Sequence, residues 1–392
     1  MKYNPRIKLI NNLIEAKKEI KTIKADPYGI EIMAPKMIHS CIKLDCVEAK
    51  IAHVLKQEML AVGGDAAVSR EIPDSAGENT DIILTGTNRQ YQELIERLKK
   101  QPFGLPKISE NIEHILNNFE KNGKSKTRIM GILNVSPDSF YDGGRYDSIE
   151  KAVARAKQMV SEGADIIDIG GESSRPGSEP VPLEEELNRV IPVIEAISSE
   201  INVPISIDTY KSEVAKKALD AGASIINDIS GLRFDKNTAK VAAKYDAPVI
   251  IMHMQGTPGD MQKNPHYVDV VGEIIAFFRE QVKFAVDSGI DENKIIIDPG
   301  IGFGKTVENN LEIIKKLKGF KVLGMPILIG TSRKSFIGAA LKQENPDDRL
   351  CGSLATVAAS IMNGADIVRV HDVLESKMVA GMIDAIINKQ QI

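Results

Sequence analysis

The chain has 392 residues, of which 43% are hydrophobic, so it can bury a large core and form one large α/β domain plus a smaller one. Its net charge is -4, with 50 Lys and Arg against 54 Asp and Glu, so no overall basic field attracts nucleic acid or an anionic membrane. No apolar run approaches the roughly 18 residues of a membrane span, and the first ten residues lack a signal-peptide core, so we expect a soluble cytoplasmic protein.

Residues 1–103 predict a smaller N-terminal α+β domain. Apolar periodicity predicts helices over 45–62 and 91–99, and short apolar runs are typical of strands at 29–33 and 81–84. No nucleotide-binding loop or metal-ligand spacing occurs in this domain. Cys41, Cys46 and Cys351 lack the paired clusters of a structural zinc site, so we expect reduced thiols.

Residues 104–127 predict a linker helix and tether. The amphipathic stretch 108–119 predicts the helix, and the polar run KNGKSKT that follows is typical of a tether. No chemistry is assigned to residues 1–127.

Residues 128–392 alternate regularly between apolar strands and amphipathic helices. The strands are predicted at 128–135, 164–171, 204–209, 224–229, 248–253, 294–300, 326–331 and 365–372. Helices are predicted between them, for example at 148–163, 183–199, 211–222, 268–289 and 307–318. Such alternation is typical of a parallel sheet covered on both faces, and eight units predict an α/β fold of the (β/α)8 TIM-barrel type. An open doubly wound sheet is the alternative, but no GxGxxG loop follows the first strand.

Polar residues stand where each predicted strand ends. They are Asn134; Glu172, Ser174 and Arg175; Asp208; Asn227 and Asp228; His253; Asp298; Ser332, Arg333 and Lys334; and Arg369 with His371. One such residue, for example Asp228, is often the N-cap of the next helix. Capping does not explain Lys334, Arg369 and His371. In a barrel all the carboxyl ends of the strands face one mouth, so these side chains should converge there.

The converging residues divide into two chemical halves. Asp208, Asn227 and Asp298 offer acceptors and an amide suited to a flat, nitrogen-rich heterocycle. The second half suits a diphosphate and its Mg²⁺, and it consists of Arg369, His371 and the neutral oxygen ligand Asn134.

Several neighbouring features support a binding site at the same mouth. The loops 136–146 and 172–181 are rich in Pro, Gly and Ser and are lid candidates, with ordinary surface turns as the alternative. Phe303, flanked by glycines in GIGFGK, is interpreted as an aromatic wall because the run lacks the GK[ST] ending of a phosphate-binding loop. His253 with Met252 is interpreted as a hydrophobic floor, not as a metal ligand.

Residues 128–388 resemble the dihydropteroate synthases. The motifs that carry the resemblance, in family order, are GILNVSPDSFYDGG, DIGGESSRPGS, SIDTYKSEVA, INDISG, IMHMQGTP, IIDPGIGFGK, GTSRKSFIG and RVHDV. Such enzymes join p-aminobenzoate to the exocyclic carbon of 6-hydroxymethyl-7,8-dihydropterin diphosphate, which releases diphosphate and forms 7,8-dihydropteroate in folate biosynthesis.

The resemblance also assigns roles to individual residues. It assigns the pterin to Asp208, Asn227, Met252, Asp298, Phe303 and Lys334. It assigns p-aminobenzoate to Ser174, Arg175, Pro176, Phe303, Ser332 and Lys334. It assigns the diphosphate to Asn134, Arg369 and His371, with Mg²⁺ on Asn134. The catalytic set it implies is Asp208, Asp298, Lys334, Arg369 and His371. Ser174 departs from the family, which often has Thr there, and this puts the pocket fit in doubt but not the reaction.

The mechanism implied by the resemblance is dissociative. Mg²⁺ and cations draw on the diphosphate, while Asp298 stabilises positive charge on the pterin. We expect small-molecule substrates and a homodimer formed through outer helices of the barrel. The alternative function is a methyltetrahydrofolate-binding methyltransferase domain, which needs neither the two lids nor the diphosphate residues.

Overall fold

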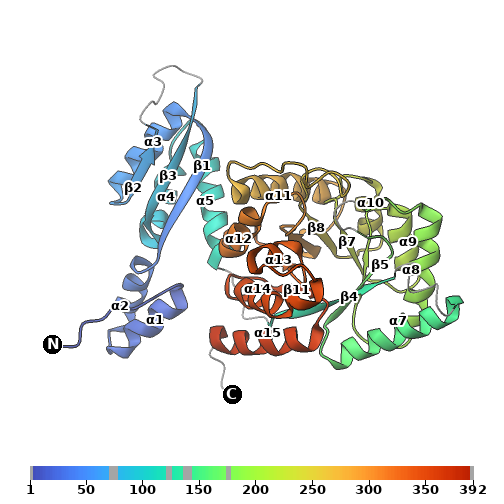
Figure 1. Cartoon of the computed structure of the whole chain (residues 1–392). Coiled ribbons are helices and arrows are strands. Elements are labelled where there is room, and N and C mark those ends of the chain that lie inside the picture. The colour runs from blue at the N-terminus through green and yellow to red at the C-terminus, as the bar shows by residue number, and fades with distance from the viewer. Residues whose placement is uncertain (1–2, 70–77, 121–125, 136–143, 174–177, 389–392) are drawn as a thin grey trace. The chain divides into compact units, whose positions relative to one another are not determined.

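The computed structural model describes residues 3–69, 78–120, 126–135, 144–173 and 178–388. The chain divides into two compact units, residues 1–122 and 123–392, which are called unit 1 and unit 2 below (Figure 1). Within the described residues, no helix is long and apolar enough to cross a membrane.

Unit 1 contains a three-stranded antiparallel sheet with helices on one face. Its elements are β1 (His39–Glu48), α3 (Ala49–Ala61), β2 (Asp65–Val68), β3 (Asn79–Thr87) and α4 (Asn88–Leu98). The strand order is β1-β3-β2. Residues along β3 alternate between buried and exposed, as expected for a strand with one face on a core. Leu55, Leu84 and Leu94 are fully buried in this core, which lies between the sheet and helices α3 and α4.

The predictions for unit 1 are confirmed in part. The strand expected at 81–84 lies inside β3, and the helix expected at 91–99 coincides with most of α4. The helix expected over 45–62 begins only at Ala49, because the preceding residues extend strand β1.

One predicted strand is wrong. Residues 29–33 lie in helix α2 (Pro27–Met33). The carboxylate of Asp26 accepts hydrogen bonds from two backbone N–H groups of the first turn, and Pro27 supplies a helical φ at the first position. This start signal outweighs the strand preference of a short apolar run.

The remaining helices of unit 1 flank these elements. They are α1 (Leu13–Thr22), the 3-10 helix η1 (Ala34–Lys36) and α5 (Leu105–Glu120). The helix expected over 108–119 is α5. It packs against α4 within unit 1, and its Leu105 and Ile112 belong to the buried core there.

Unit 2 is a (β/α)8 barrel, as the sequence predicts. Eight parallel strands run in the order β10-β11-β4-β5-β6-β7-β8-β9, and a parallel bridge between Ile297 and Ile327 joins the two ends of this row. The strands are β4 (Arg128–Asn134), β5 (Ile166–Gly170), β6 (Ile205–Asp208), β7 (Ile225–Asp228), β8 (Val249–Met252), β9 (Ile295–Asp298), β10 (Leu328–Ile329) and β11 (Ile367–Val370). Each lies inside the segment predicted for it.

The helices of unit 2 surround the strands (Figure 1). They are α7 (Gly144–Ser161), α8 (Leu183–Ser198), α9 (Ser212–Asp220), α10 (Asn237–Lys244), α11 (Val270–Asp287), α12 (Val307–Lys315), α13 (Ser335–Leu341), α14 (Leu350–Met362) and α15 (Val373–Asn388). Short 3-10 helices are η2 (Glu292–Lys294), η3 (Leu317–Leu323) and η4 (Pro346–Arg349). Local signals set several starts; Thr306 and Asn309, for example, form a reciprocal capping box on α12.

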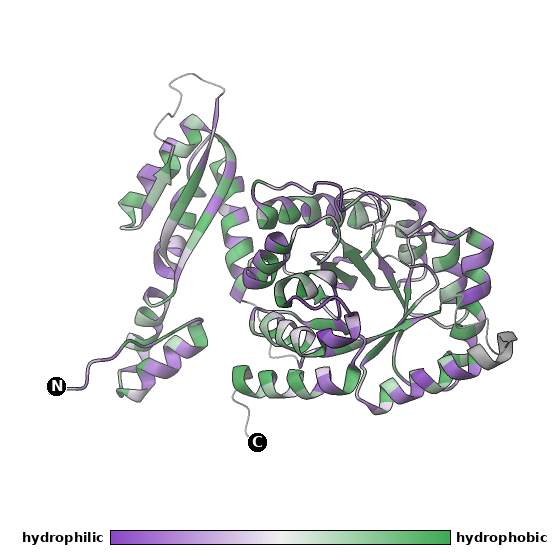
Figure 2. Ribbon diagram, in the orientation of Figure 1, coloured by the Kyte–Doolittle hydropathy of each residue, from purple (hydrophilic) through white to green (hydrophobic). Residues whose placement is uncertain are grey.

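The barrel strands bury apolar side chains on both faces, and Figure 2 shows them largely in green. The outer face packs on the helices and forms the largest apolar cluster of the molecule. The inner face forms a separate apolar layer that closes the barrel interior. This inner layer consists of Met130, Ile166, Ile225, Ile250, Ile296, Leu328 and Ile367.

Candidate active site

A second layer of inward side chains lies above the inner apolar layer, toward the carboxyl ends of the strands. A strand returns to the same face every second residue, so a residue two or four positions beyond an inner-layer residue faces the same interior. Asp208 belongs to the same set because it is the register partner of Asn227 on the neighbouring strand. The resulting set, here called the mouth layer, is Asn134, Asp168, Asp208, Asn227, Met252, Asp298 and Arg369.

Arg369 is the centre of the mouth layer. Its Nε donates to Asp168 Oδ2 at 2.6 Å, and its Nη2 donates to Asp208 Oδ2 at 2.7 Å. The same oxygen of Asp168 accepts from Asn227 Nδ2 at 3.2 Å. These contacts join strands β11, β5, β6 and β7, and the last one leaves the amide oxygen of Asn227 directed away from Asp168.

The charges of this network are held in a poorly solvated place. Burial raises the pKa of Asp208 to about 7, and the charge of Asp168 adds to this shift while Arg369 opposes it. Burial alone would lower the pKa of Arg369, but the two carboxylates outweigh it and raise that pKa. The guanidinium therefore stays charged, and it holds the two acids in place.

Asp298 and Lys334 form a second charged group at the mouth. Burial raises the pKa of Asp298, which Lys334 opposes, and burial lowers the pKa of Lys334 to about 8, which Asp298 opposes. Asp298 Oδ1 accepts from the Gly300 backbone N–H at 2.7 Å. The ammonium of Lys334 lies 4.7 Å from the centre of the Phe303 ring and donates to the backbone carbonyl of Ile301.

Phe303 and Met252 contribute an apolar surface next to these charges. Met252, Met254 and Met261 form a small buried cluster with Ile229, and Phe303 packs on it. Thioether and aromatic surface of this kind suits the face of a flat ring.

His371 and Ser332 lie together beside the mouth layer. Ser332 Oγ is 3.0 Å from His371 Nδ1 and also accepts from the His371 backbone N–H at 3.2 Å. The pair links the segment after β10 to the residue that follows β11.

Asn134 borders the same space as Asp208. A Cβ atom placed on Gly170 would lie 3.7 Å from Asp208 Oδ2 and 3.8 Å from Asn134 Oδ1, so both oxygens face the room that the glycine leaves. Within the described residues, no group of three His, Cys, Asp or Glu side chains gathers as a ready metal site. Mg²⁺, however, is often bound by one or two protein oxygens together with substrate phosphates and waters. A single exposed amide oxygen at the mouth fits that chemistry.

Three other strand-end residues have structural partners. His253 Nδ1 lies 3.0 Å from Lys305 Nζ, and burial lowers the pKa of His253 to about 2, so its ring stays neutral. Asp228 caps no helix; it accepts from the backbone of Ser230 and Leu232 in the loop that follows its strand. Arg333 pairs with Asp372 and with Asp347. Ser174, Arg175 and Pro176, predicted for p-aminobenzoate, lie outside the described residues.

The sequence reasoning missed Asp168 and Lys305. Asp168 is fully buried in β5, and its letter stands in the middle of the apolar run IIDIG. Lys305 is 3% exposed. For Asp168 the available signal was a charged residue inside an apolar run, because such residues are rarely buried unless they are paired.

Lys211 was also missed, although it fixes the base of a predicted lid. Its Nζ lies 2.6 Å from Glu172 Oε2, 2.5 Å from Glu186 Oε2 and 2.6 Å from the Val181 carbonyl oxygen. Tyr210 donates to the other oxygen of Glu172 at 2.9 Å. Glu172 is thus bound at the strand end by two neighbouring side chains.

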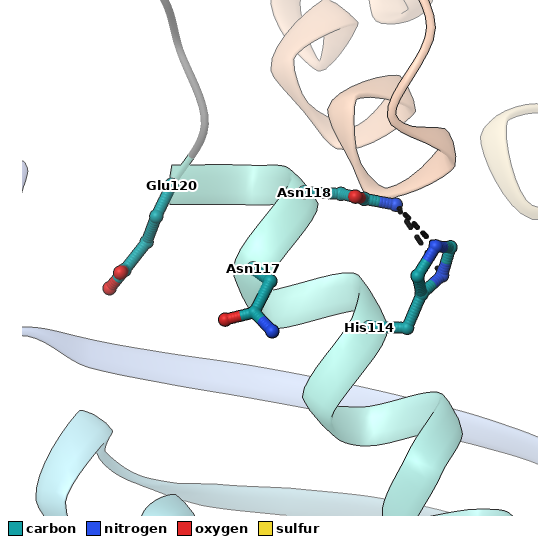
Figure 3. A pocket seen from close by; sticks show the side chains of 4 residues that line it. All are labelled: His114, Asn117, Asn118 and Glu120. Atoms are coloured by element: carbon teal, nitrogen blue, oxygen red, sulfur yellow. Dashed lines mark hydrogen bonds between the residues drawn. The ribbon is translucent and has the colours of Figure 1, made fainter.

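A hollow on unit 1 is a separate feature. Four side chains of helix α5 line it: His114, Asn117, Asn118 and Glu120 (Figure 3). Asn118 Nδ2 lies 3.3 Å from His114 Nε2. The two residues are one helical turn apart, and side chains at i and i+4 of a helix are ordinarily neighbours. The helix geometry alone accounts for this pair.

Comparison with known proteins agrees with the geometry of the barrel. The family described as "Pterin binding enzyme" matches residues 130–371. Dihydropteroate synthase of Bacillus subtilis is 52% identical over 266 residues, which is 68% of this chain and 90% of that protein. The structure of Xanthomonas albilineans dihydropteroate synthase with 4-aminobenzoic acid is 44% identical, has a TM-score of 0.63, and covers 67% of this chain and 94% of that one.

A third relative extends beyond the barrel. The probable bifunctional folylpolyglutamate synthase/dihydropteroate synthase of Halobacterium salinarum is 41% identical over 378 residues, which is 94% of this chain and 45% of that protein. The barrel with its charged mouth layer is that of a pterin-binding enzyme. Within that class, the chain belongs to the dihydropteroate synthase family.

Proposed function

We propose that this enzyme condenses 6-hydroxymethyl-7,8-dihydropterin diphosphate with p-aminobenzoate, which yields 7,8-dihydropteroate and diphosphate in folate biosynthesis. The relatives named dihydropteroate synthase support the reaction, and the structure with 4-aminobenzoic acid supports the second substrate. Location in the cytoplasm stays a prediction, which cell fractionation would test.

The observation that carries the proposal is the 2.7 Å contact between Arg369 and Asp208. The diphosphate of this substrate is separated from the pterin ring by a single methylene group, so its two recognition sites must be adjacent. Asp208 belongs to the pterin half and Arg369 to the diphosphate half. The hydrogen bonds from Arg369 to Asp168 and Asp208 use two of the five N–H groups of the guanidinium, so Arg369 keeps donors for phosphate oxygens.

In the proposed mechanism, the bond between the methylene carbon and the diphosphate oxygen breaks, and its electron pair leaves on the diphosphate. The amine of p-aminobenzoate then forms the new C–N bond and releases a proton to water. Asp298 and Asp208 stabilise the positive charge that develops on the pterin, while Arg369 and His371 hold the leaving group. Lys334 and Phe303 orient the ring, and the family resemblance assigns p-aminobenzoate to Ser332 together with Ser174, Arg175 and Pro176.

We assign Mg²⁺ to Asn134 in the same proposal. When bound, the ion would neutralise charge on the leaving diphosphate. Replacing Asn134 with Ala should raise the Mg²⁺ concentration needed for half-maximal rate, whereas replacing the exposed Asn293 should not.

The direct test is diphosphate release by the purified chain. The protein is given the pterin diphosphate and Mg²⁺, with and without p-aminobenzoate, and 7,8-dihydropteroate is detected by mass spectrometry. Release that depends on p-aminobenzoate and yields dihydropteroate is the expected result. Tight pterin binding with no release would instead favour the methyltetrahydrofolate-binding alternative.

We also propose a homodimer formed through helices α14 and α15. Four exposed apolar residues recur every fourth position along α15: Leu374, Met378, Met382 and Ile386. Met362, at the end of α14, is 59% exposed. Figure 2 shows α15 mostly in green. A contiguous exposed apolar stripe of this kind marks an association surface.

Sedimentation equilibrium tests this assembly. The wild-type chain is expected at twice its 42.9 kDa mass. Met378→Glu should shift it to the monomer, because a buried, unpaired carboxylate opposes association. Leu311→Glu, at an exposed apolar residue of α12, is the matched control and should leave the dimer intact. A monomeric wild type would refute the proposal.

A further inference from the structure

The loop between β9 and α12 is held by side chains at four successive backbone carbonyls. Ile301 O accepts from Lys334 Nζ, and Gly302 O accepts from Gln262 Nε2 at 2.6 Å. Phe303 O accepts from Lys305 Nζ at 3.0 Å, and Gly304 O accepts from Tyr267 Oη at 2.9 Å. These donors come from several segments of unit 2.

The backbone of this loop requires such support. Gly300, Gly302 and Gly304 have φ values of +70°, +83° and +63°, which only glycine adopts readily. Because these three glycines alternate with other residues, the carbonyl groups of the loop do not join the hydrogen-bond ladder of a strand or helix. Without these side-chain donors, each of the four carbonyl groups would lose a hydrogen bond, three of them in partly buried positions. The four side chains therefore define the loop conformation that presents the Phe303 ring.

Lys305 is the buried member of this set. Three acceptors surround its Nζ: Phe303 O at 3.0 Å, His253 Nδ1 at 3.0 Å and His253 O at 3.4 Å. The amine thus ties the loop to the end of strand β8. Burial lowers the pKa of Lys305 well below its usual value, and the charge of Asp298 opposes this shift. In either protonation state the amine has N–H donors for the two carbonyl oxygens.

His253 is positioned to serve this lysine. Its ring packs edge-on against Phe277, with centroids 4.8 Å apart, and lies 6.1 Å from the Tyr267 ring. The neutral imidazole is fixed by these contacts with one nitrogen toward Lys305. His253, which the sequence predicts to belong to a hydrophobic floor, therefore anchors the β9–α12 loop to the end of β8.

We infer that Lys305 is a positioning residue that acts through Phe303. It fixes the backbone segment that carries the Phe303 ring, which forms the aromatic wall of the substrate site. The inference rests on the proposed function, since Phe303 is expected to line the p-aminobenzoate and pterin pockets. The hydrogen bonds of Lys305 are to Phe303 and His253.

The test compares steady-state kinetics of Lys305→Met, Phe303→Ala and the double variant in the full chain. Methionine keeps the length of the side chain and removes the donors. We expect Lys305→Met to raise KM for p-aminobenzoate by roughly 5- to 20-fold, the scale of one altered pocket contact, with kcat changed by less than about threefold. The ratio of its effects on the two substrates should match that of Phe303→Ala. The double variant should then resemble Phe303→Ala alone, because residues that act as one unit are not additive.

A matched control separates positioning from general destabilisation. Ile313→Ala removes fully buried volume from helix α12 without touching the loop carbonyls, and it should lower the unfolding midpoint while leaving KM unchanged. If Lys305→Met fails to fold, His253→Phe removes one acceptor while keeping an aromatic ring, and it should raise the same KM by a smaller factor.

Two outcomes would overturn the inference. Unchanged KM in a folded, active Lys305→Met enzyme is one, and full additivity with Phe303→Ala is the other. A wild-type chain that releases no diphosphate under the same conditions would count against the proposed function instead, so the two failures are distinguishable.

Discussion

At the scale of single residues, Arg369 is the side chain on which most of the mouth layer depends. It is bonded to Asp168 and Asp208, and it is the only one of the three that carries positive charge. Its loss removes a preorganised donor to the leaving diphosphate and leaves two nearby carboxylates without their shared counter-charge. Both consequences follow from the same contacts, but they are measured differently.

Arg369→Ala should therefore lower kcat by about a hundredfold or more, the usual cost of one preorganised electrostatic contact. It should also lower the unfolding midpoint, because a buried ion pair that loses one partner is destabilising. Steady-state kinetics and urea unfolding test the two effects. Lys157→Met breaks the exposed ion pair with Glu200 and serves as the control, since such pairs contribute little. Near-normal turnover in Arg369→Ala would contradict the assignment.

A second residue-scale prediction concerns pH. Asp208 must be ionised to accept from pterin N–H groups, so kcat/KM should rise as pH increases through its pKa of about 7. Lys334 carries a positive charge only while it is protonated, and loss of that charge weakens its hydrogen bonds to the substrate, so kcat/KM should fall as pH increases through its pKa of about 8. A plot of kcat/KM against pH should therefore be a narrow bell with its maximum between these two pKa values. In Asp208→Asn the residual activity should lose the acidic limb and keep the alkaline one, and an unchanged profile would refute the assignment.

At the residue scale, the sequence predicted the site residues that stand at strand ends. It missed those that lie inside a strand or support the site from a loop. Asp298 and Arg369 stand at the ends of apolar runs, where a polar letter signals the mouth of a barrel. Asp168 stands within a run, and its partners lie 59 and 201 positions away along the chain. Lys305 acts on a neighbouring backbone carbonyl. Such partnerships exist only after the strands have closed into a ring.

At the scale of elements, the β9–α12 loop shows why its glycines are required. A Cβ atom on Gly300 would lie 1.9 Å from the His253 carbonyl oxygen, and its φ is +70°. The close approach brings strand β8 and the loop together at the point where Lys305 also binds both. No side chain fits between two backbones at that distance.

Gly300→Ala should consequently destabilise the protein by at least about 2 kcal/mol, from strain at positive φ and a clash with rigid backbone. Gly29→Ala provides the contrast: it lies in helix α2, has open space around it, and should be neutral or stabilising by up to about 1 kcal/mol. Chemical denaturation of both variants checks the pair. A Gly300→Ala protein as stable as wild type would show that this loop can move.

Element prediction succeeded where one pattern extended over many residues. The eight barrel strands are short apolar runs bounded by turn residues, and each was found because the next repeat confirmed the period. The run at 29–33 had no such repeat, and the helix start at Asp26 and Pro27 decided its conformation. Strand β10 is only two residues long, so its ends depend on pairing with β11 and not on composition.

At the scale of the whole molecule, the two units have separate apolar cores. The Bacillus subtilis enzyme matches 68% of this chain, whereas the Halobacterium protein matches 94% of it and so extends over most of unit 1. The residues of the mouth layer all belong to unit 2. Unit 1 therefore lies largely within the Halobacterium match and contributes no residue to the mouth layer.

A fragment of residues 123–392 should fold alone and keep kcat within about threefold of the full chain, because a compact unit with its own core is an independent domain. The start point matters, since the backbone N–H and hydroxyl of Thr127 both donate to the carboxylate of Asp384 at 2.9 and 2.8 Å. A fragment that begins at residue 130 loses those bonds and should unfold at a lower temperature. Diphosphate release, circular dichroism and sedimentation of both fragments distinguish the cases. If the 123–392 fragment is folded but inactive, unit 1 takes part in the reaction; if it is active but monomeric while the full chain is a dimer, unit 1 serves assembly.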